Sequence, residues 1–204
     1  MGNLKSLKHI YLEGNNLSSL PDSIGSLKSI IRLSFINNKL SSLPDSIGSL
    51  KTLEKLYLQE NKLLSLPDII DSLKSLKELN LSYNELSSLP DSIGNLKTLK
   101  TLNLGSNELS SLPDSIGSLK SLKTLPLYDN KLISLPEIIP KMTWLKELSL
   151  ARNNLSSLSD SIGSLKSLEI LRLDDNKLSS LPERIKKELK TLKDNGCDIS
   201  GVDL

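Results

Sequence analysis

A 23-residue unit that recurs without insertion or deletion is the strongest constraint on the fold of this chain. Eight consecutive units cover residues 4–187, and each begins with an apolar residue: Leu4, Leu27, Leu50, Leu73, Leu96, Leu119, Met142 and Leu165. Self-similarity at a period of 20–50 residues is typical of solenoids and other repeat arrays. We number the repeat positions 1 to 23 from the first residue of each unit.

The positions of the apolar and amide residues predict how each unit folds. Positions 1, 4, 7, 9, 14, 17 and 21 are apolar in all eight units. Positions 7 and 9 alternate with polar positions, which is the period of a half-buried strand. Position 12 is always asparagine, whose carboxamide both donates and accepts hydrogen bonds, so stacked units should form a buried amide ladder. Position 18 is proline in seven units, with Ser159 as the exception.

Composition agrees with one short unit written many times. Leucine supplies 48 and serine 35 of the 204 residues, whereas alanine, valine and phenylalanine occur once each. No apolar stretch approaches the roughly 18–20 residues that span a membrane, and the first residues do not resemble a signal peptide. One cysteine cannot form an internal disulfide or a multi-cysteine metal site. We therefore expect no metal, no cofactor and no membrane insertion.

The pattern LxxLxxLxLxxNxLxxLPxxIxx closely resembles the leucine-rich repeat, in the 23-residue form found in intracellular and bacterial proteins. The resemblance covers 184 of the 204 residues. It implies an α/β fold: a right-handed solenoid with a concave parallel sheet and short helical or irregular turns on the convex side. The chain lacks the cysteine-rich flanking caps that extracellular members often carry. This favours an intracellular or bacterial setting, and localisation is otherwise open.

The two ends of the chain differ from the repeats between them. Residues 1–3 match positions 21–23 and predict a partial repeat before the eight units of 4–187. A capping helix should begin near residue 182, place Ile185, Leu189 and Leu192 on the last unit, and give way to the end of the cap in 188–204. No matching cap precedes the first unit. We expect its strand edge to pair with a second copy or with upstream repeats.

Positions 6, 8, 10, 11 and 13 should face the concave side, and their residue types are uneven. All four tyrosines and three of the four arginines lie there, and these two residue types dominate interface energetics. The alternative is that these positions tolerate any polar residue. Eight basic and nine acidic side chains share this face, which argues against nucleic-acid binding. The predicted partner-binding residues are Tyr11, Arg32, Tyr57, Tyr83, Tyr128, Arg152 and Arg172.

Three local departures from the repeat carry their own predictions. Pro126 at position 8 removes a donor from the sheet, so the sheet should be pinched or bulged there. Trp144 at position 3 should repack the turn of the seventh unit. Positions 15 and 20 hold extra apolar residues that either form a contact patch or fill local gaps, and we favour the second: Leu64, Ile69, Ile133 and Ile138.

These features favour non-catalytic binding of a protein or peptide on the concave sheet. Nucleophilic catalysis needs a base beside its serine or cysteine, but His9 and Cys197 lie near opposite ends of the array. No phosphate-binding or dinucleotide-binding motif occurs. The alternative is a structural repeat segment without a ligand of its own, as part of a larger receptor-like or effector protein or as an engineered scaffold. An enzyme with an unrecognised site is the least favoured interpretation.

Overall fold

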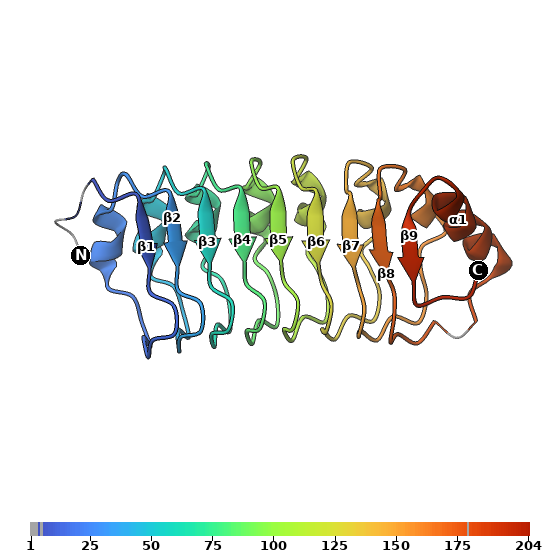
Figure 1. The fold of residues 1–204 in the computed structure, drawn as a ribbon, viewed down its shortest axis with the longest axis horizontal. Coiled ribbons are helices and arrows are strands. Elements are labelled where there is room, and N and C mark those ends of the chain that lie inside the picture. The colour runs from blue at the N-terminus through green and yellow to red at the C-terminus, as the bar shows by residue number, and fades with distance from the viewer. Residues whose placement is uncertain (1–3, 5, 179) are drawn as a thin grey trace.

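The protein is a solenoid in which each repeat contributes one short parallel strand. The computed structural model describes residues 4, 6–178 and 180–204. Its nine strands form one sheet in chain order (Figure 1). Their bounds are β1 His9–Tyr11, β2 Arg32–Ser34, β3 Lys55–Tyr57, β4 Glu78–Asn80, β5 Thr101–Asn103, β6 Thr124–Pro126, β7 Glu147–Ser149, β8 Ile170–Arg172 and β9 Asp198–Ser200.

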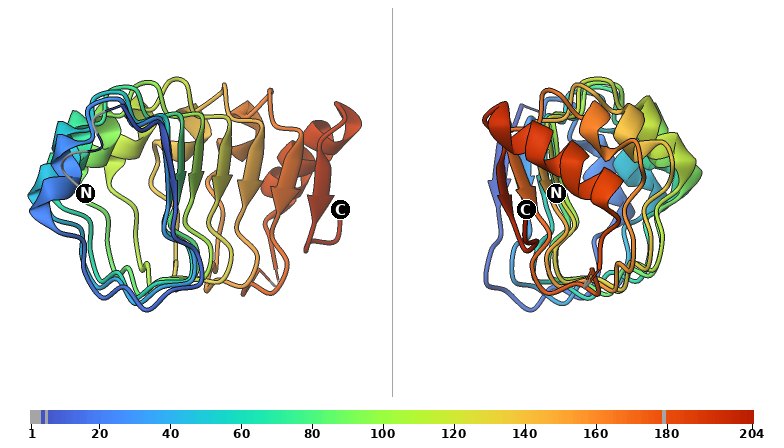
Figure 2. Two further views of the ribbon diagram at one scale, coloured as in Figure 1. Left: turned by 60° about the vertical axis from the view of Figure 1, so that its left-hand side comes forward. Right: turned by 90° about the vertical axis from the view of Figure 1, so that its right-hand side faces the viewer.

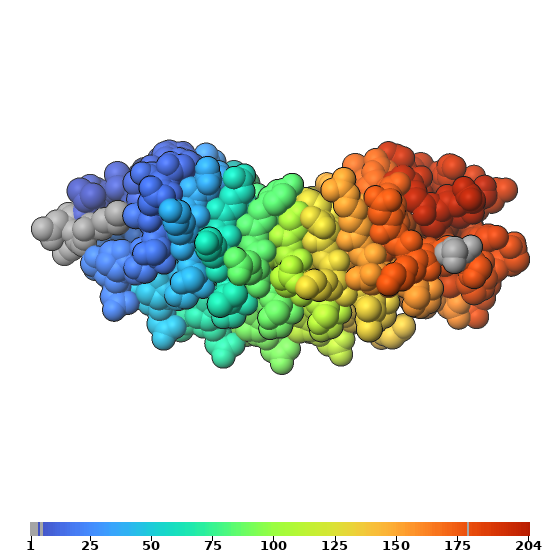
Figure 3. Space-filling model, turned by 90° about the horizontal axis from the view of Figure 1, so that it is seen from below, coloured from blue at the N-terminus to red at the C-terminus, as the bar shows by residue number. Residues whose placement is uncertain are grey.

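The strands and the helical turns lie on opposite sides of the solenoid. Figure 2 shows the sheet on one side and the helices on the other. Seen end-on to the strands, the sheet side is hollowed over the middle repeats (Figure 3). The 3-10 helices of the other side are Asp22–Ser26, Asp45–Ser49, Asp68–Ser72, Asp91–Asn95, Asp114–Ser118, Ile139–Lys141 and Ile162–Ser164.

The sequence explains where most of these 3-10 helices begin. In the first five repeats, the position-18 proline stands at the N-cap with φ between −73° and −70°, within the range that its ring allows. An acidic residue follows and faces the positive end of the helix. In the sixth and seventh repeats the 3-10 helix begins later, at Ile139 and Ile162, although the sixth has Pro136 and the seventh has Ser159 at position 18. The proline alone therefore does not set where the helix begins.

The core is one continuous cluster built from the apolar positions predicted for it. Most of these side chains are fully buried. Burial is least complete in the first repeat, where Leu4 is exposed and Leu7, Leu12 and Leu17 are only partly buried. Burial of the leucine at position 7 turns the side chains at positions 6 and 8 to the open face of the sheet. The core therefore sets which residues a partner can reach.

The predicted asparagine ladder is present. Six of the eight asparagines are buried, and Asn84 is 8% exposed. The Asn84 side-chain amide donates to the carbonyls of Leu58, Leu81 and Ser82, and its Oδ1 accepts the Leu63 N–H at 2.9 Å. Asn15, in the first repeat, is exposed and donates only within its own repeat. From the second repeat onward, each asparagine thus ties its own repeat to the preceding one.

The C-terminal segment covers the last repeat with a helix and an additional strand. Helix α1 spans Glu183–Asp194, and its buried side chains are Ile185, Leu189 and Leu192. It contacts the 3-10 helix Ile162–Ser164 of the seventh repeat. The sequence analysis did not foresee β9, which pairs with β8 in parallel through Leu171 and Ile199. The cap thus extends the sheet as well as covering the core.

Pro126 interrupts the sheet on one side only. Between β5 and β6 a single residue pair, Thr101 and Thr124, is in register, whereas every other pair of neighbouring strands has three. Proline has no N–H to donate toward β5. The 23-residue offset continues on both sides, and the Leu104 N–H still reaches the Pro126 carbonyl at 2.9 Å. The ladder is therefore broken locally, as predicted, without a bulge.

Trp144 replaces a hydrogen bond that smaller residues make in other repeats. The position-3 hydroxyl of Thr52 donates to carbonyls of the preceding repeat, as does that of Thr98. The Trp144 indole N–H does the same to the Leu119 carbonyl at 3.0 Å. Lys120 lies over the indole ring at 4.0 Å from its centroid. This agrees with the expected local repacking.

The extra apolar residues divide into two kinds. Ile69 and Ile138, at position 20, pack against Gly48 and Gly117 of the preceding repeats, where a Cβ would clash with them. They fill local gaps, as we favoured. Leu64 and Ile133, at position 15, are 57% and 64% exposed. For these two residues the gap-filling interpretation is wrong.

Candidate functional site

The seven predicted partner-binding residues lie on or beside the open face of the sheet. Tyr11, Arg32, Tyr57 and Arg172 are strand residues at positions 6 and 8, beside the buried position 7. Tyr128, Tyr83 and Arg152 follow the strands at positions 10 and 11. None of the seven is buried. They form three separate groups along the sheet rather than one cluster.

The first group, in repeats 1 to 4, is a network of side chains that bind one another. The Arg32 guanidinium donates to the Tyr11 hydroxyl at 3.3 Å and lies 5.8 Å from the centroid of the Tyr57 ring. The Tyr57 hydroxyl and Lys55 Nζ each donate to a Glu78 carboxylate oxygen at 2.5 Å. Every contact joins neighbouring repeats. A partner would therefore meet a pre-ordered surface here.

Electrostatics in this network follow from its hydrogen bonds. Burial, followed by the hydrogen bond to Glu78, raises the pKa of Tyr57 to about 12. Partial burial alone would raise the pKa of Glu78, but the hydrogen bonds from Lys55 and Tyr57 outweigh it and lower that pKa. The raised pKa of Tyr57 and the lowered pKa of Glu78 both favour a neutral phenol that donates to a charged carboxylate.

The second group is an aromatic pair over the middle of the sheet. The Tyr128 ring extends from the sixth repeat across Gly105 of the fifth, where a Cβ would lie 2.3 Å from the ring atoms. It meets Tyr83 of the fourth repeat with centroids 6.5 Å apart in an edge-on arrangement. Burial, and then the Tyr83 hydroxyl, raise the pKa of Tyr128. Tyr83 remains 54% exposed, so this pair presents aromatic surface to a partner.

Position 11 has a backbone conformation that the sequence analysis missed. Its residue has a positive φ in every repeat, between 53° and 65°. This left-handed conformation favours glycine, asparagine and aspartate, and only four repeats have those types here: Gly14, Asn37, Asp129 and Asp175. From the first repeat to the eighth, position 11 is occupied by Gly14, Asn37, Glu60, Tyr83, Ser106, Asp129, Arg152 and Asp175.

Arg152 contributes little to holding the sheet together. Its Nε lies 3.9 Å from Asp175 Oδ2, and both side chains are mostly exposed. An exposed pair at this distance adds little stability. Arg152 is therefore available to a partner.

The third group belongs partly to the C-terminal cap. Arg172 donates to Asp198 of β9, through Nη2 to the carboxylate at 2.5 Å and through Nη1 to the carbonyl at 3.0 Å. The hydrogen bond to Asp198 raises the pKa of Arg172, and the same bond lowers the pKa of Asp198. Arg172 thus helps to hold the C-terminal strand β9 against β8.

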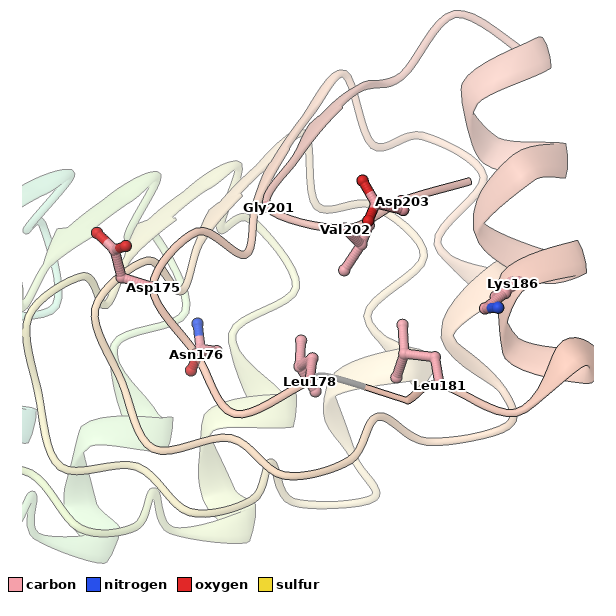
Figure 4. A pocket seen from close by; sticks show the side chains of 8 residues that line it. All are labelled: Asp175, Asn176, Leu178, Leu181, Lys186, Gly201, Val202 and Asp203. Carbon is pink, nitrogen blue, oxygen red and sulfur yellow. The ribbon is translucent and has the colours of Figure 1, made fainter.

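A hollow of about 470 Å³ lies beside the last repeat, away from the three groups. In the seven preceding repeats, the N–H at position 14 donates to the asparagine of the next repeat. No asparagine stands 21 residues after Leu178, where the next repeat would supply this acceptor. Figure 4 shows the lining side chains around the open space: Asp175, Asn176, Leu178, Leu181, Lys186, Gly201, Val202 and Asp203.

The described residues do not assemble a recognisable catalytic or metal centre. His9 lies in β1, and Cys197 directly precedes β9 at the other end of the sheet. Burial raises the pKa of the Cys197 thiol, which disfavours the reactive thiolate. Within the described ranges, no group of three or more His, Cys, Asp or Glu side chains is placed to hold a metal ion. None of the helices described is long and apolar enough to cross a membrane.

Comparison with known proteins identifies the family. A model described as leucine-rich repeat region matches residues 1–84 and 76–157. The chain belongs to the leucine-rich repeat family. A search of curated proteins finds no match. Family and fold therefore agree with the resemblance found in the sequence.

Two solved leucine-rich repeat structures resemble this one closely. A leucine-rich repeat protein of Leptospira interrogans is 40% identical, with a TM-score of 0.88 over 93% of this chain and 48% of that one. This chain thus spans about half the length of the Leptospira protein. The leucine-rich repeat domain of the type III effector XopL is 30% identical, with a TM-score of 0.81 over 98% of this chain and 70% of that one.

Proposed function

We propose that this leucine-rich repeat protein is a non-catalytic scaffold that binds a protein or peptide on the open face of its sheet. The observation that carries the proposal is the accessible aromatic surface of this face. Tyr11 and Tyr83 are each 54% exposed there. Such aromatic side chains supply large contact area at low entropic cost, whereas the buried leucines of the same repeats have no accessible surface to offer.

The charge pattern supports a protein partner over a nucleic acid. A phosphate backbone requires a basic stripe, but acidic and basic side chains alternate on this face, and several neutralise one another. Lys55 pairs with Glu78, and Lys131 with Glu108. Near-balanced charge leaves aromatic contact and hydrogen bonding to provide the affinity.

Selection from a displayed library of random linear peptides tests the proposal. The full chain is compared with a variant that carries tyrosine-to-serine substitutions at all four tyrosines. The matched control carries Leu64→Ser and Ile133→Ser, which remove exposed apolar side chains outside the sheet. Circular dichroism melts establish that both variants are folded. Peptides selected on the wild-type chain should lose at least about tenfold in affinity, or roughly 1.4 kcal/mol, on the tyrosine variant only.

A specific observation favours the alternative of a purely architectural segment. Arg32, Tyr57 and Arg172 already bind side chains of their own chain, so these three could serve stability alone. If no peptide is enriched, the architectural interpretation replaces the proposal. If binding survives the loss of all four tyrosines, the open face of the sheet is not the binding surface that we propose.

A further inference from the structure

We infer that the centre of the sheet binds a proline-rich segment in the polyproline II conformation, seated on Tyr83 and Tyr128. This inference rests on the proposed function and specifies the partner's chemistry. It follows from three features of the middle repeats: the seating of the aromatic pair, the polarity of the nearby hydrogen-bonding groups, and a strip of uncharged residues on the fifth and sixth repeats.

The aromatic pair is held in place by the repeat next to it. Tyr128 crosses the fifth repeat because Gly105 leaves room for the ring, and a Cβ there would lie 2.3 Å from it. In the described part of the chain, Gly105 is the one glycine at position 10. Its placement below the ring fixes the two tyrosines 6.5 Å apart. Two residues of a polyproline II helix rise about 6.2 Å, which matches this spacing.

The hydrogen-bonding groups beside the pair present donors. Asn80 and Asn103 are neighbours in register on β4 and β5. The Oδ1 of Asn80 accepts from the Ser82 N–H and hydroxyl at 3.0 and 2.8 Å. The Oδ1 of Asn103 accepts from the Gly105 N–H at 3.1 Å. With both oxygens held by their own repeats, each side-chain NH₂ is directed outward.

A proline-rich backbone complements this arrangement. Proline offers a carbonyl acceptor and has no N–H to donate, so two outward NH₂ donors satisfy it and no donor of the ligand is left unmatched. Aromatic-lined surfaces are the usual receptors for such segments, whose preformed conformation lowers the entropic cost of binding. Other extended peptides would bring N–H groups, for which these asparagines offer one free lone pair, on Asn103 Oδ1, because Asn80 Oδ1 already accepts two hydrogen bonds.

The charge around the pair disfavours an acidic ligand. On the open face of the fifth repeat, positions 6, 8, 10 and 11 are uncharged: Thr101, Asn103, Gly105 and Ser106. Thr124 and Pro126 continue this strip on β6. Glu108, at position 13, pairs with Lys131, and Glu78 pairs with Lys55. The Asp129 carboxylate borders the strip, accepts from the Ser106 hydroxyl at 2.9 Å and would repel an acidic segment.

The test uses the full ¹⁵N-labelled chain and two capped peptides. Hexaproline, acetylated and amidated, is titrated against the hexapeptide Gly-Ser-Gly-Ser-Gly-Ser with the same caps. The ¹H–¹⁵N spectrum reports the side-chain NH₂ pairs of Asn80 and Asn103 directly. We expect hexaproline to shift both pairs saturably and to bind at least about tenfold more tightly than the Gly-Ser peptide.

Matched variants locate the binding site. Tyr83→Ser should weaken hexaproline binding at least about tenfold, whereas Leu64→Ser, which removes a similarly exposed side chain outside the sheet, should leave it unchanged. Gly105→Ala should weaken it as well, because the new Cβ displaces the Tyr128 ring. Asn103→Asp, which keeps the inward oxygen but removes the outward donor, covers the case in which Gly105→Ala fails to fold.

The inference is overturned if hexaproline binds no more tightly than the Gly-Ser peptide, or if the Leu64 and Tyr83 variants lose affinity equally. Its failure can be distinguished from failure of the proposed function. If the peptide library yields ligands that need the tyrosines but are charged or lack proline, the scaffold function stands and the proline preference falls. If neither hexaproline nor any library peptide depends on the tyrosines, both fall.

Discussion

Removing one amide from the asparagine ladder should cost far more in the middle of the solenoid than at its beginning. We compare Asn84→Ala with Asn15→Ala, the same substitution at the same repeat position. Asn84 is buried and serves one N–H and three carbonyls, whereas Asn15 is exposed and donates to two carbonyls of its own repeat. The two substitutions differ only in whether a preceding repeat depends on the side chain.

The magnitude follows from the groups left without partners. Asn84→Ala leaves the Leu63 N–H without its partner in a dry interior, and such a group costs about 1–3 kcal/mol. The Leu58, Leu81 and Ser82 carbonyls keep other donors, from Asn61, Asn107 and Glu60. The free energy of unfolding should therefore fall by about 1–3 kcal/mol. At Asn15, water replaces the lost partner, and the change should stay within about 0.5 kcal/mol.

Urea denaturation followed by far-ultraviolet circular dichroism measures the difference in the free energy of unfolding. Repeat arrays can unfold in parts, so native-state hydrogen exchange accompanies it and should show lost protection centred on the Leu63 amide. Asn84→Asp provides a second comparison, because its carboxylate can accept from Leu63 but faces three carbonyl oxygens as a charge. Equal losses at Asn15 and Asn84 would show that the ladder does not hold the repeats together.

Three further predictions concern single positions. Ser106→Val should destabilise by about 1–3 kcal/mol, since a β-branched residue tolerates positive φ poorly, whereas Ser106→Gly should not; thermal melts compare them. Pro126→Ser should restore a donor toward β5 and stabilise by about 1 kcal/mol, seen as slower hydrogen exchange in that strand; an unchanged rate would contradict it. Because folding raises the pKa of Tyr57, the protonated phenol stabilises the fold below pH 10, and this stability is lost between pH 10 and about 12. Phenolate absorbance should show late-titrating tyrosines, of which the Tyr57 transition moves to lower pH in Glu78→Gln.

Features that recur in every repeat could be predicted from the sequence. The leucine at position 7 and the asparagine at position 12 solve the same packing problem eight times, so their role is visible as periodicity. Asn84 is buried, and Tyr57 lies on the open face, as the position assignment requires. The same logic placed α1, because Ile185, Leu189 and Leu192 have helical spacing and the last repeat must be covered.

Features that occur once were harder to foresee. Strand β9 is three residues long and belongs to no repeat, so the segment around Ile199 shows no period. The positive φ at position 11 is hidden because residues as different as Tyr83 and Asp175 occupy it. A signal was nevertheless present in Gly14 and Asn37, the residue types that favour this conformation, at the same position of the first two repeats.

In a solenoid, the contacts that form a site join residues roughly one or two repeats apart rather than sequence neighbours. Arg32 reaches Tyr11 and Tyr57 reaches Glu78, each 21 residues away, and Tyr128 meets Tyr83 across two repeats. A departure from the consensus must therefore be interpreted together with the residues at the same height in adjacent repeats. Gly105 is unremarkable within its own repeat, but beside Tyr128 it becomes the seat of an aromatic pair. Because the core positions are shared by all repeats, such lateral combinations on the open face are where this chain can differ in what it binds.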